Sequence, residues 1–269
     1  MIRFDVNISI LLKEVPFLER FAYAARLGFG AVEFWWPGDE NLEGVVEQLR
    51  QTGLKVALMN FDAGNMGGGD RGFLNDASRK AWFRDHAPRA LEFAARIGCQ
   101  RLNALAGNTI AGERREAQLE MVRENLAYAA DRAAAFGLGV VVESLNSFEN
   151  TRYLLTNTRE TLALLDEVNR PNLQYQYDLY HMQRMEGNLI ATLQAHIGRI
   201  GHIQVADSPA RHEPGTGEIH YPHVLAALDA LDYPGYVGLE YNPSSSSEAS
   251  FGWLPADKRG NISIEDLRL

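Results

Sequence analysis

The stretch QYDLYHMQRMEGNL, residues 176–189, joins a strand-like run to a polar segment rich in potential ligands. The run over residues 172–177 is typical of a β-strand and ends at Asp178, with His181 three residues later. A carboxylate at the end of a buried strand lies at the edge of the sheet, where a metal ion or a substrate can reach it. Asp178 is therefore a candidate site residue.

Three further strand-like runs end on an oxygen-bearing side chain. Residues 140–142 lead into Glu143, residues 202–203 into Gln204, and residues 237–239 into Glu240. Together with Asp178 these residues follow one another at intervals of roughly 30 residues, the length of one βα unit. The spacing predicts that all four lie at the ends of successive strands in a repeating βα fold.

Strand and helix patterns alternate along the whole chain, and glycines often mark the helix ends. We predict strands at residues 4–10, 31–34, 55–61, 101–106, 138–143, 172–178, 200–206 and 236–240, and helices at 17–28, 42–51, 78–97, 113–136, 158–168, 189–197 and 222–231. Eight strands that alternate with helices in about 250 residues predict an α/β fold, a single (β/α)8 TIM barrel whose site lies at the carboxyl ends of the strands. We expect residues 1–269 to form one domain with a short C-terminal extension from about residue 244.

Two segments do not follow the alternating pattern. The glycine-rich loop at residues 62–76 is unusually long, which is typical either of a lid over a site or of a plain surface loop. It lacks the Lys-Ser/Thr pair of a P-loop. The tail begins with four serines, residues 244–247, which we expect to be partly flexible, and its short turn at residues 264–267 could close the barrel.

Composition narrows the class of protein. A hydrophobic content of 46% and a charged content of 23% are ordinary for a globular protein, and the net charge of −9 speaks against a nucleic-acid partner. Cys99 is the only cysteine, so no intrachain disulfide can form, and we expect a small buried residue rather than a reactive thiol. The chain shows neither a signal peptide nor a membrane span, which predicts a cytoplasmic protein without a membrane partner.

The four strand-end residues would converge on one side of the barrel mouth. Three carboxylates packed together repel one another unless a cation neutralises them, and a set of oxygen donors favours Mg²⁺ or Mn²⁺ over Zn²⁺. We therefore predict a metal site. Nearby groups that could contact a substrate are His181, Glu149 in the loop after Glu143, and Arg211 and His212 in the loop after Gln204. Each of these could equally be a packing or surface residue.

Several segments of the sequence resemble the hydroxypyruvate isomerase family of xylose isomerase-like TIM barrels, which is related to the ketose 3-epimerases. The resemblance is carried by QYDLYHMQRMEGNL, by GHIQVADSPARHEPGTGEIHY at residues 201–221 and by GLEYNP at 238–243. FDVNISILL at residues 4–12 and LGFGAVEFWWP at 27–37 extend it over nearly the whole chain. The loop word RHEPGTGE is specific, whereas acidic strand ends are shared by many relatives.

The resemblance implies that Glu143, Asp178, Gln204 and Glu240 hold a divalent metal and that Glu143 and Glu240 form the acid/base pair. It also implies that His181, Glu149 and Arg211 contact substrate. The epimerases usually carry His where this chain has Gln204, although Gln fits the isomerase branch. The implied reaction interconverts hydroxypyruvate and 2-hydroxy-3-oxopropanoate (tartronate semialdehyde) through an enediolate. Family habit and the pair Trp35-Trp36 suggest a homo-oligomer, although exposed aromatic residues also line barrel mouths.

Other functions remain open at this stage. Close relatives isomerise the four-carbon acid 2-dehydrotetronate, and a ketose 3-epimerase agrees less well with the isomerase-specific words. An apurinic endonuclease of the same barrel class needs a three-metal cluster with several histidines and a basic groove, whereas this chain has 7 histidines and a net charge of −9. A barrel that only binds a sugar acid would not exchange substrate protons with solvent.

Overall fold

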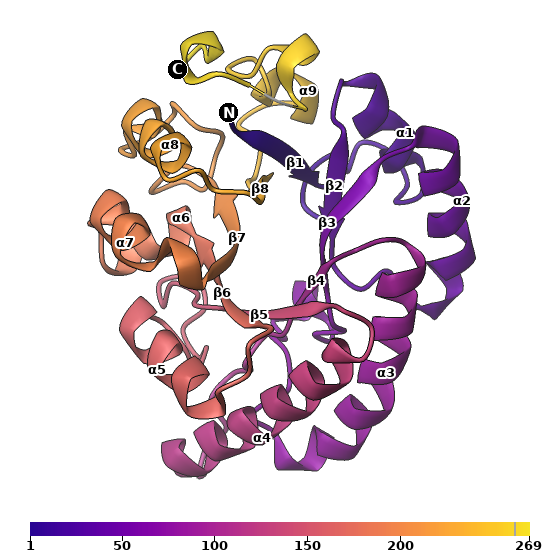
Figure 1. Ribbon diagram of the computed structural model, residues 1–269, viewed down its shortest axis with the longest axis vertical. Coiled ribbons are helices and arrows are strands. Elements are labelled where there is room, and N and C mark those ends of the chain that lie inside the picture. The colour runs from indigo at the N-terminus through magenta and orange to yellow at the C-terminus, as the bar shows by residue number, and fades with distance from the viewer. Residues whose placement is uncertain (261) are drawn as a thin grey trace.

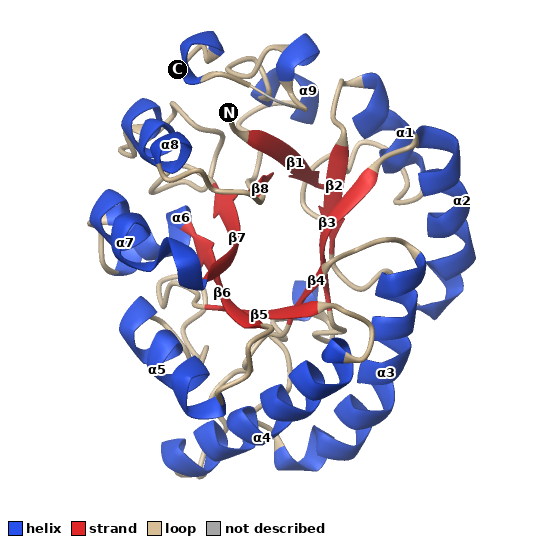
Figure 2. Ribbon diagram, viewed as in Figure 1, coloured by secondary structure: helices blue, strands red, loops and turns tan. Residues whose placement is uncertain are grey.

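The computed structural model, which describes residues 1–260 and 262–269, is a closed barrel of eight parallel strands in sequence order (Figure 1). Helices form the outer layer around the strands (Figure 2). The predicted (β/α)8 architecture is confirmed. The strands are β1 (Arg3–Asn7), β2 (Ala31–Phe34), β3 (Lys55–Asn60), β4 (Arg101–Asn103), β5 (Gly139–Glu143), β6 (Leu173–Asp178), β7 (Ile200–Val205) and β8 (Tyr236–Leu239).

The helices fill the connections between the strands. The α-helices are α1 (Glu19–Arg26), α2 (Leu42–Thr52), α3 (Lys80–Arg96), α4 (Arg115–Ala134), α5 (Thr158–Val168), α6 (Leu179–Met185), α7 (Leu189–His196), α8 (Tyr221–Ala230) and α9 (Ser247–Ser250). Short 3-10 turns are η1 (Asp39–Asn41), η2 (Met66–Gly68), η3 (Ala77–Arg79), η4 (Ile197–Arg199), η5 (Ala256–Lys258) and η6 (Ile264–Asp266). None of the described helices is long and apolar enough to cross a membrane.

Two predicted strands extend too far. The first ends at Asn7 rather than at residue 10, because the Asn7 side chain accepts a hydrogen bond from Ser9 N–H and its carbonyl accepts from Leu11 N–H. The fourth ends at Asn103 rather than at residue 106, because the Ala106 N–H donates to the Tyr153 hydroxyl instead of to a strand. Side-chain hydrogen bonds of this kind compete with the strand ladder.

Helix α6 is absent from the predicted elements, although the sequence contains its start signal. The Asp178 carboxylate caps it by accepting from the N–H groups of Tyr180 and His181 at 2.8 and 3.3 Å. Asp178 is therefore both the last residue of β6 and the N-cap of the helix. This double role fixes the direction in which its second oxygen points.

Aromatic and aliphatic side chains fill the space between the strands and the helices. Phe34 of β2 is buried and lies in edge contact with Phe17 and Phe21, at centroid distances of 6.0 and 5.7 Å. Helix α4 turns Val122, Leu126 and other apolar side chains inward, as its spacing predicts. The inside of the barrel, by contrast, contains several buried polar side chains.

The C-terminal tail packs beside the beginning of β1. Pairing of β8 with β1 closes the barrel, so the tail does not; it adds an antiparallel bridge between Ile262 and Ile2 and an edge contact of Trp253 with Phe4. The prediction of a flexible serine run is wrong at Ser247, which is buried. Its hydroxyl donates to Glu14 and accepts from the N–H of Leu12, so these bonds hold the start of α9 in place.

Cys99 agrees with its predicted role. The side chain is buried before β4, and burial raises the pKa of its thiol to about 12. A thiol with so high a pKa is almost wholly protonated at neutral pH and hence poorly nucleophilic.

Candidate active site

The four predicted metal ligands lie at the carboxyl ends of four adjacent strands. Glu143 ends β5, Asp178 ends β6, Gln204 is the next-to-last residue of β7, and Glu240 follows β8 directly. The strand register sets Asp178 beside Gln204. The spacing argument thus places the strand ends correctly, since neighbouring parallel strands in a barrel end on the same face.

A cavity of about 500 Å³ opens at this face of the barrel. Two of the four strand-end residues, both glutamates, line it together with two arginines, one histidine and several apolar side chains. The principal lining residues are Trp35, Arg71, Glu143, His181, Arg211 and Glu240.

Glu143, Asp178 and His181 form one tight group. Their candidate ligand atoms lie within 4.8 Å of one another, and all three side chains are buried. The His181 Nε2 is 3.6 Å from Asp178 Oδ2 and 4.0 Å from Glu143 Oε1. Glu143 also accepts a hydrogen bond from Asn103 at 2.9 Å, which orients its carboxylate.

Glu240 and Arg211 face this group from the other side. An Nη2 donor of Arg211 lies 2.6 Å from Glu240 Oε2 and 4.0 Å from Asp178 Oδ2. The second oxygen of Glu240 accepts from the Asn7 side chain at 2.8 Å. Arg211 adopts a left-handed backbone conformation, with φ at 58°, which aims its side chain back into the barrel mouth. Its guanidinium therefore offsets part of the negative charge.

Burial raises the pKa of each carboxyl group in the site. Desolvation, reinforced by the charge of Asp178, raises the pKa of Glu240 to about 8, although Arg211 opposes the shift. Desolvation raises the pKa of Asp178 to about 6. The Glu143 pKa is raised well above its usual range by burial and by the charges of Glu240 and Asp178. Because all three pKa values are raised, these carboxyl groups ionise together only when positive charge lies beside them.

Gln204 is not among the residues that line the cavity. Its amide nitrogen donates to Glu33 Oε1 at 2.6 Å, and its carbonyl oxygen accepts from Gln176 at 2.7 Å. The hydrogen bond to Glu33 fixes the orientation of the amide, with Nε2 toward Glu33 and the carbonyl oxygen toward Gln176. A carbonyl oxygen has two lone pairs, so the Gln204 oxygen keeps one for a cation.

The donor set fits a divalent cation. Asp178 Oδ2 is fully buried and has no hydrogen-bond partner in the described part of the chain, which is costly for a carboxylate oxygen unless a cation or a proton lies beside it. Carboxylate and amide oxygens are the donors that Mg²⁺ and Mn²⁺ prefer. His181 adds a nitrogen beside this set.

His181 is a neutral imidazole. Its Nδ1 accepts the backbone N–H of Asn146 at 3.2 Å, so the proton is assigned to Nε2, which faces the carboxylates. Burial and the charge of Arg211 hold its pKa well below the usual range. This tautomer offers an N–H donor to the cavity.

Glu149 and His212 do not line the cavity. Glu149 accepts from the Tyr180 hydroxyl at 2.7 Å, and the Tyr180 ring in turn lies under the Arg211 guanidinium at 5.4 Å. The His212 Nδ1 lies 2.7 Å from the Asn242 carbonyl oxygen. Glu149 therefore reaches Arg211 only through Tyr180, and His212 contacts the backbone of Asn242 rather than the cavity.

Arg71 and Asn7 belong to the site but are missing from the predicted residues. Arg71 comes from the glycine-rich loop, where its guanidinium bonds to Met66 O and Asn150 Oδ1. A single arginine inside an otherwise glycine-rich loop was the available signal. Asn7 is hidden in the first strand, far from Glu240 in sequence, and no local pattern marks it.

Comparison with known proteins agrees with this geometry. The model of the family described as xylose isomerase-like TIM barrel matches residues 21–257. The chain belongs to this family. It is 41% identical to the hydroxypyruvate isomerase of Escherichia coli (strain K12), over 94% of this chain and 98% of that protein. It is 39% identical to the 2-oxo-tetronate isomerase of Pectobacterium atrosepticum, over 94% of this chain and 97% of that protein.

A solved structure is similarly close. The crystal structure described as AP endonuclease, family 2, from Brucella melitensis superimposes with a TM-score of 0.90 at 40% identity, and covers 94% of this chain and 98% of that one. The resemblance of the sequence words to the hydroxypyruvate isomerases is confirmed, and this member of the xylose isomerase-like family is an isomerase.

Proposed function

We propose that this chain is a divalent metal-dependent isomerase that interconverts hydroxypyruvate and 2-hydroxy-3-oxopropanoate. The observation that carries the proposal is a pair of buried glutamates, Glu143 and Glu240, lining one small cavity together with Arg71 and Arg211. Two carboxyl groups provide for removal and return of a proton, and two guanidinium groups suit a substrate that is itself a carboxylate.

Glu143, Asp178, Gln204 and Glu240 would hold the cation, with Mg²⁺ or Mn²⁺ favoured by their oxygen donors. A cation bound there supplies Lewis-acid polarisation of the substrate carbonyl and lowers the pKa values of the carboxyl groups beside it. All further steps fall to side chains of the chain itself.

Proton transfer is the work of the two glutamates. One carboxylate takes a proton from C3 of hydroxypyruvate, and the electron pair of that C–H bond forms the C2–C3 double bond of an enediolate. A glutamic acid then returns a proton to C2, while the hydroxyl proton on the C3 oxygen is lost and the C2 oxygen gains one. Without a cation the pKa of Glu240 is about 8, and a cation beside it would lower that value, which favours the carboxylate form that takes the proton.

Substrate orientation falls to the arginines and the neutral histidine. Arg71 Nη2 makes none of the bonds that anchor the Arg71 guanidinium to its loop, so it is the donor we assign to the substrate carboxylate. The Nε2–H of His181 would donate to a substrate oxygen beside Asp178. Glu149, through Tyr180, would position Arg211, and His212 would hold the same loop against residue 242.

A four-carbon substrate is the second candidate. Relatives named 2-oxo-tetronate isomerase are as similar to this chain as those named hydroxypyruvate isomerase, at 39% and 41% identity. The chemistry would be the same and only the length of the acid would differ.

Proton NMR in deuterated water tests the proposal. Purified protein treated with EDTA should be inactive, and adding Mg²⁺ or Mn²⁺ should restore isomerisation of hydroxypyruvate at a rate above that of 2-dehydrotetronate. Glu143→Gln and Glu240→Gln should each abolish turnover while leaving the circular dichroism spectrum unchanged. Faster turnover of the four-carbon acid would move the assignment to the second candidate, and no exchange on either acid would refute both.

A further inference from the structure

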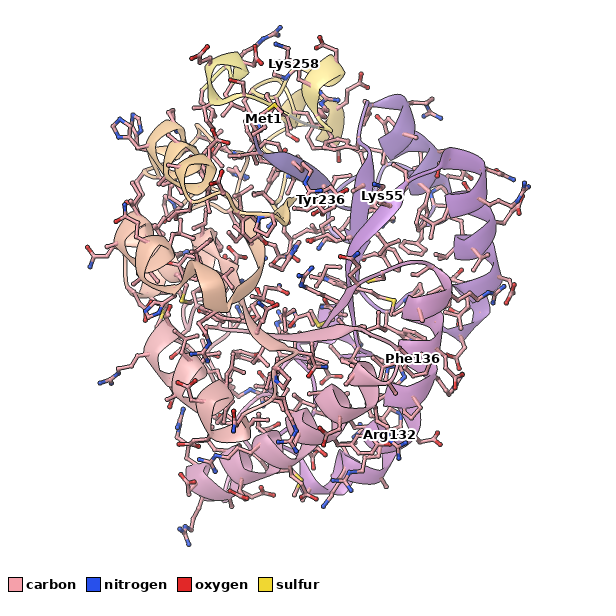
Figure 3. The ribbon with its side chains drawn as sticks, viewed as in Figure 1. Met1, Lys55, Arg132, Phe136, Tyr236 and Lys258 are labelled. Atoms are coloured by element: carbon pink, nitrogen blue, oxygen red, sulfur yellow. The ribbon has the colours of Figure 1, made fainter. Side chains whose placement is uncertain are left out.

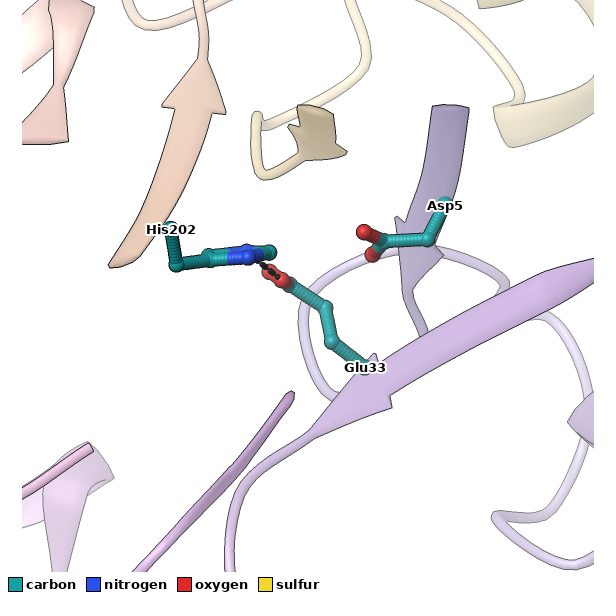
Figure 4. Close-up of side chains that lie close together, drawn as sticks. All are labelled: Asp5, Glu33 and His202. Carbon is teal, nitrogen blue, oxygen red and sulfur yellow. Dashed lines mark hydrogen bonds and ion pairs between the residues drawn. The ribbon is translucent and has the colours of Figure 1, made fainter. Parts of the chain in front are cut away.

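A second buried cluster of ligand-type side chains lies inside the barrel, apart from the cavity. It consists of Asp5 from β1, Glu33 from β2 and His202 from β7, and their candidate ligand atoms lie within 4.8 Å of one another. The exposed fractions of the three residues are 0%, 0% and 2%. Figure 4 shows the Glu33 carboxylate joined to the His202 ring, with the Asp5 carboxylate facing this pair.

The Asp5 carboxylate has no partner that explains its burial. Both of its oxygens are fully buried, and neither receives a hydrogen bond from a donor group in the described part of the chain; the Glu33 carboxyl lies within reach, but it can bond Asp5 only when one of the two carboxyl groups is protonated. Glu33, in contrast, is bonded on every side: Oε1 accepts from Asn7 and Gln204, and Oε2 lies 2.5 Å from His202 Nε2. An unpartnered carboxylate in this position needs a cation or a proton beside it.

The backbone leaves room for this arrangement at Gly238. This glycine pairs with Asp5 across the β1–β8 ladder, and a Cβ at its position would come within 2.6 Å of Glu33 Oε2. Any other residue would push the Glu33 carboxylate away from Asp5 and His202. The glycine thus keeps the three side chains within reach of one point.

The charge of the cluster also calls for a cation. Asp5 and Glu33 carry two negative charges when ionised, and neither forms an ion pair with an arginine or lysine among residues 1–260 and 262–269. Burial, with the charge of Glu33 beside it, raises the pKa of Asp5 well above its usual range. A divalent cation with a neutral imidazole would bring the formal charge of the cluster to zero.

We propose that Asp5, Glu33 and His202 form a second divalent-cation site, separate from the ligand set at the barrel mouth. Two carboxylate oxygens and one imidazole nitrogen suit Zn²⁺ or Mn²⁺ better than Mg²⁺, which prefers oxygen alone. The ion would join the first, second and seventh strands, and it would fix the carboxylate of Glu33, on which the orientation of Gln204 depends. Its role is structural, because the cluster does not face the catalytic cavity.

Access to this site is from the opposite end of the barrel. His202 lines a cavity at the amino ends of the strands, together with Arg3, Lys55 and Arg101, the first residues of β1, β3 and β4. Tyr236, the first residue of β8, also lines this cavity and is labelled with Lys55 in Figure 3. Three cationic side chains at this entrance would slow the passage of a metal ion. The inner ion should therefore exchange more slowly than the ion at the mouth.

Metal content tests the proposal. Protein produced with Mn²⁺ or Zn²⁺ in the growth medium should contain two equivalents of metal per chain by mass spectrometry of the acid-digested protein. Brief EDTA treatment should remove one equivalent and leave the other. Asp5→Asn, which keeps the shape of the side chain and removes its charge, should lose the slowly exchanging equivalent and keep the rapidly exchanging one. Asp178→Asn is the matched variant and should lose the rapidly exchanging equivalent instead.

Anomalous X-ray scattering from wild-type crystals grown with Mn²⁺ or Zn²⁺ locates each ion separately. A peak between Asp5, Glu33 and His202 is the expected result, whether or not a peak appears at the barrel mouth and whether or not Asp5→Asn folds. No peak at the cluster, with a metal content that Asp5→Asn leaves unchanged, would overturn the proposal. The two carboxyl groups would then share protons instead.

Discussion

Replacing Arg71 by methionine should lower kcat/KM for hydroxypyruvate by about 10- to 150-fold. The structure gives the basis for this estimate: Arg71 is half-buried at the cavity, and Nη2 is left over after the other nitrogens have bonded to Met66 O, Asp70 O and Asn150 Oδ1. A hydrogen bond to a charged partner contributes about 1.5–3 kcal/mol. Each 1.36 kcal/mol is about tenfold in rate.

The assay must separate the substrate carboxylate from the loop that Arg71 also holds. Dihydroxyacetone has the same ketol group but a neutral CH₂OH in place of the carboxylate, and its carbinol protons can be followed by exchange in deuterated water. Arg71→Met should lower the rate on hydroxypyruvate by the full 10- to 150-fold, but lower the exchange rate on dihydroxyacetone only by the smaller amount that comes from disturbing the loop. Arg71→Lys should recover part of the rate on hydroxypyruvate. Equal losses on both compounds would refute the assignment of Arg71 to the carboxylate.

Three further outcomes follow from features of the fold. Phe34→Ala should lower the free energy of unfolding by about 3–5 kcal/mol in urea titration, because it empties the space between two other phenylalanines; a loss below about 1 kcal/mol would mean that the site collapses freely. Gly217→Ala should cost about 1–3 kcal/mol, because its Cβ would lie 2.0 Å from the Ser208 carbonyl oxygen, whereas the control Gly198→Ala, with nothing within 4 Å, should be near neutral by the same titration. After EDTA treatment, the stability that Glu240 contributes should be fully present below its usual pKa of 4.5 and lost as pH rises through about 8, because the folded state holds the proton more tightly. Urea midpoints at pH 6, 7 and 8.5 should fall in that order without Mg²⁺ and change little with it; a rise with pH would contradict the raised pKa.

The barrel could be predicted because its signals are local and repeated. Strand runs that end on Glu143, Asp178 and Glu240 recur at the spacing of one βα unit, and parallel pairing brings such ends together whatever the loops do. The strand boundaries were less accurate, because side-chain bonds such as that of Tyr153 to the Ala106 N–H end a strand before its apolar run ends.

The polar side chains buried inside the barrel could not be predicted, for a physical reason. Asn7, Glu33 and His202 sit inside strands whose inward positions in an α/β barrel are usually apolar, and nothing beside them in the sequence shows that they face one another. Their contacts cross the barrel between β1, β2 and β7. Only closure of the sheet brings them together, so local patterns carry no trace of them.

The bond from Asn7 to Glu240 spans 233 positions of the chain and links the first strand to the last. During synthesis one edge of β1 and one edge of β7 remain unpaired until β8 has left the ribosome. Until then these exposed edges of the nascent sheet are open to aggregation. The same bond makes enzyme activity a reporter of completed folding. In a refolding experiment helix signals should return first, and turnover should return only with the slower phase in which the two ends of the sheet meet.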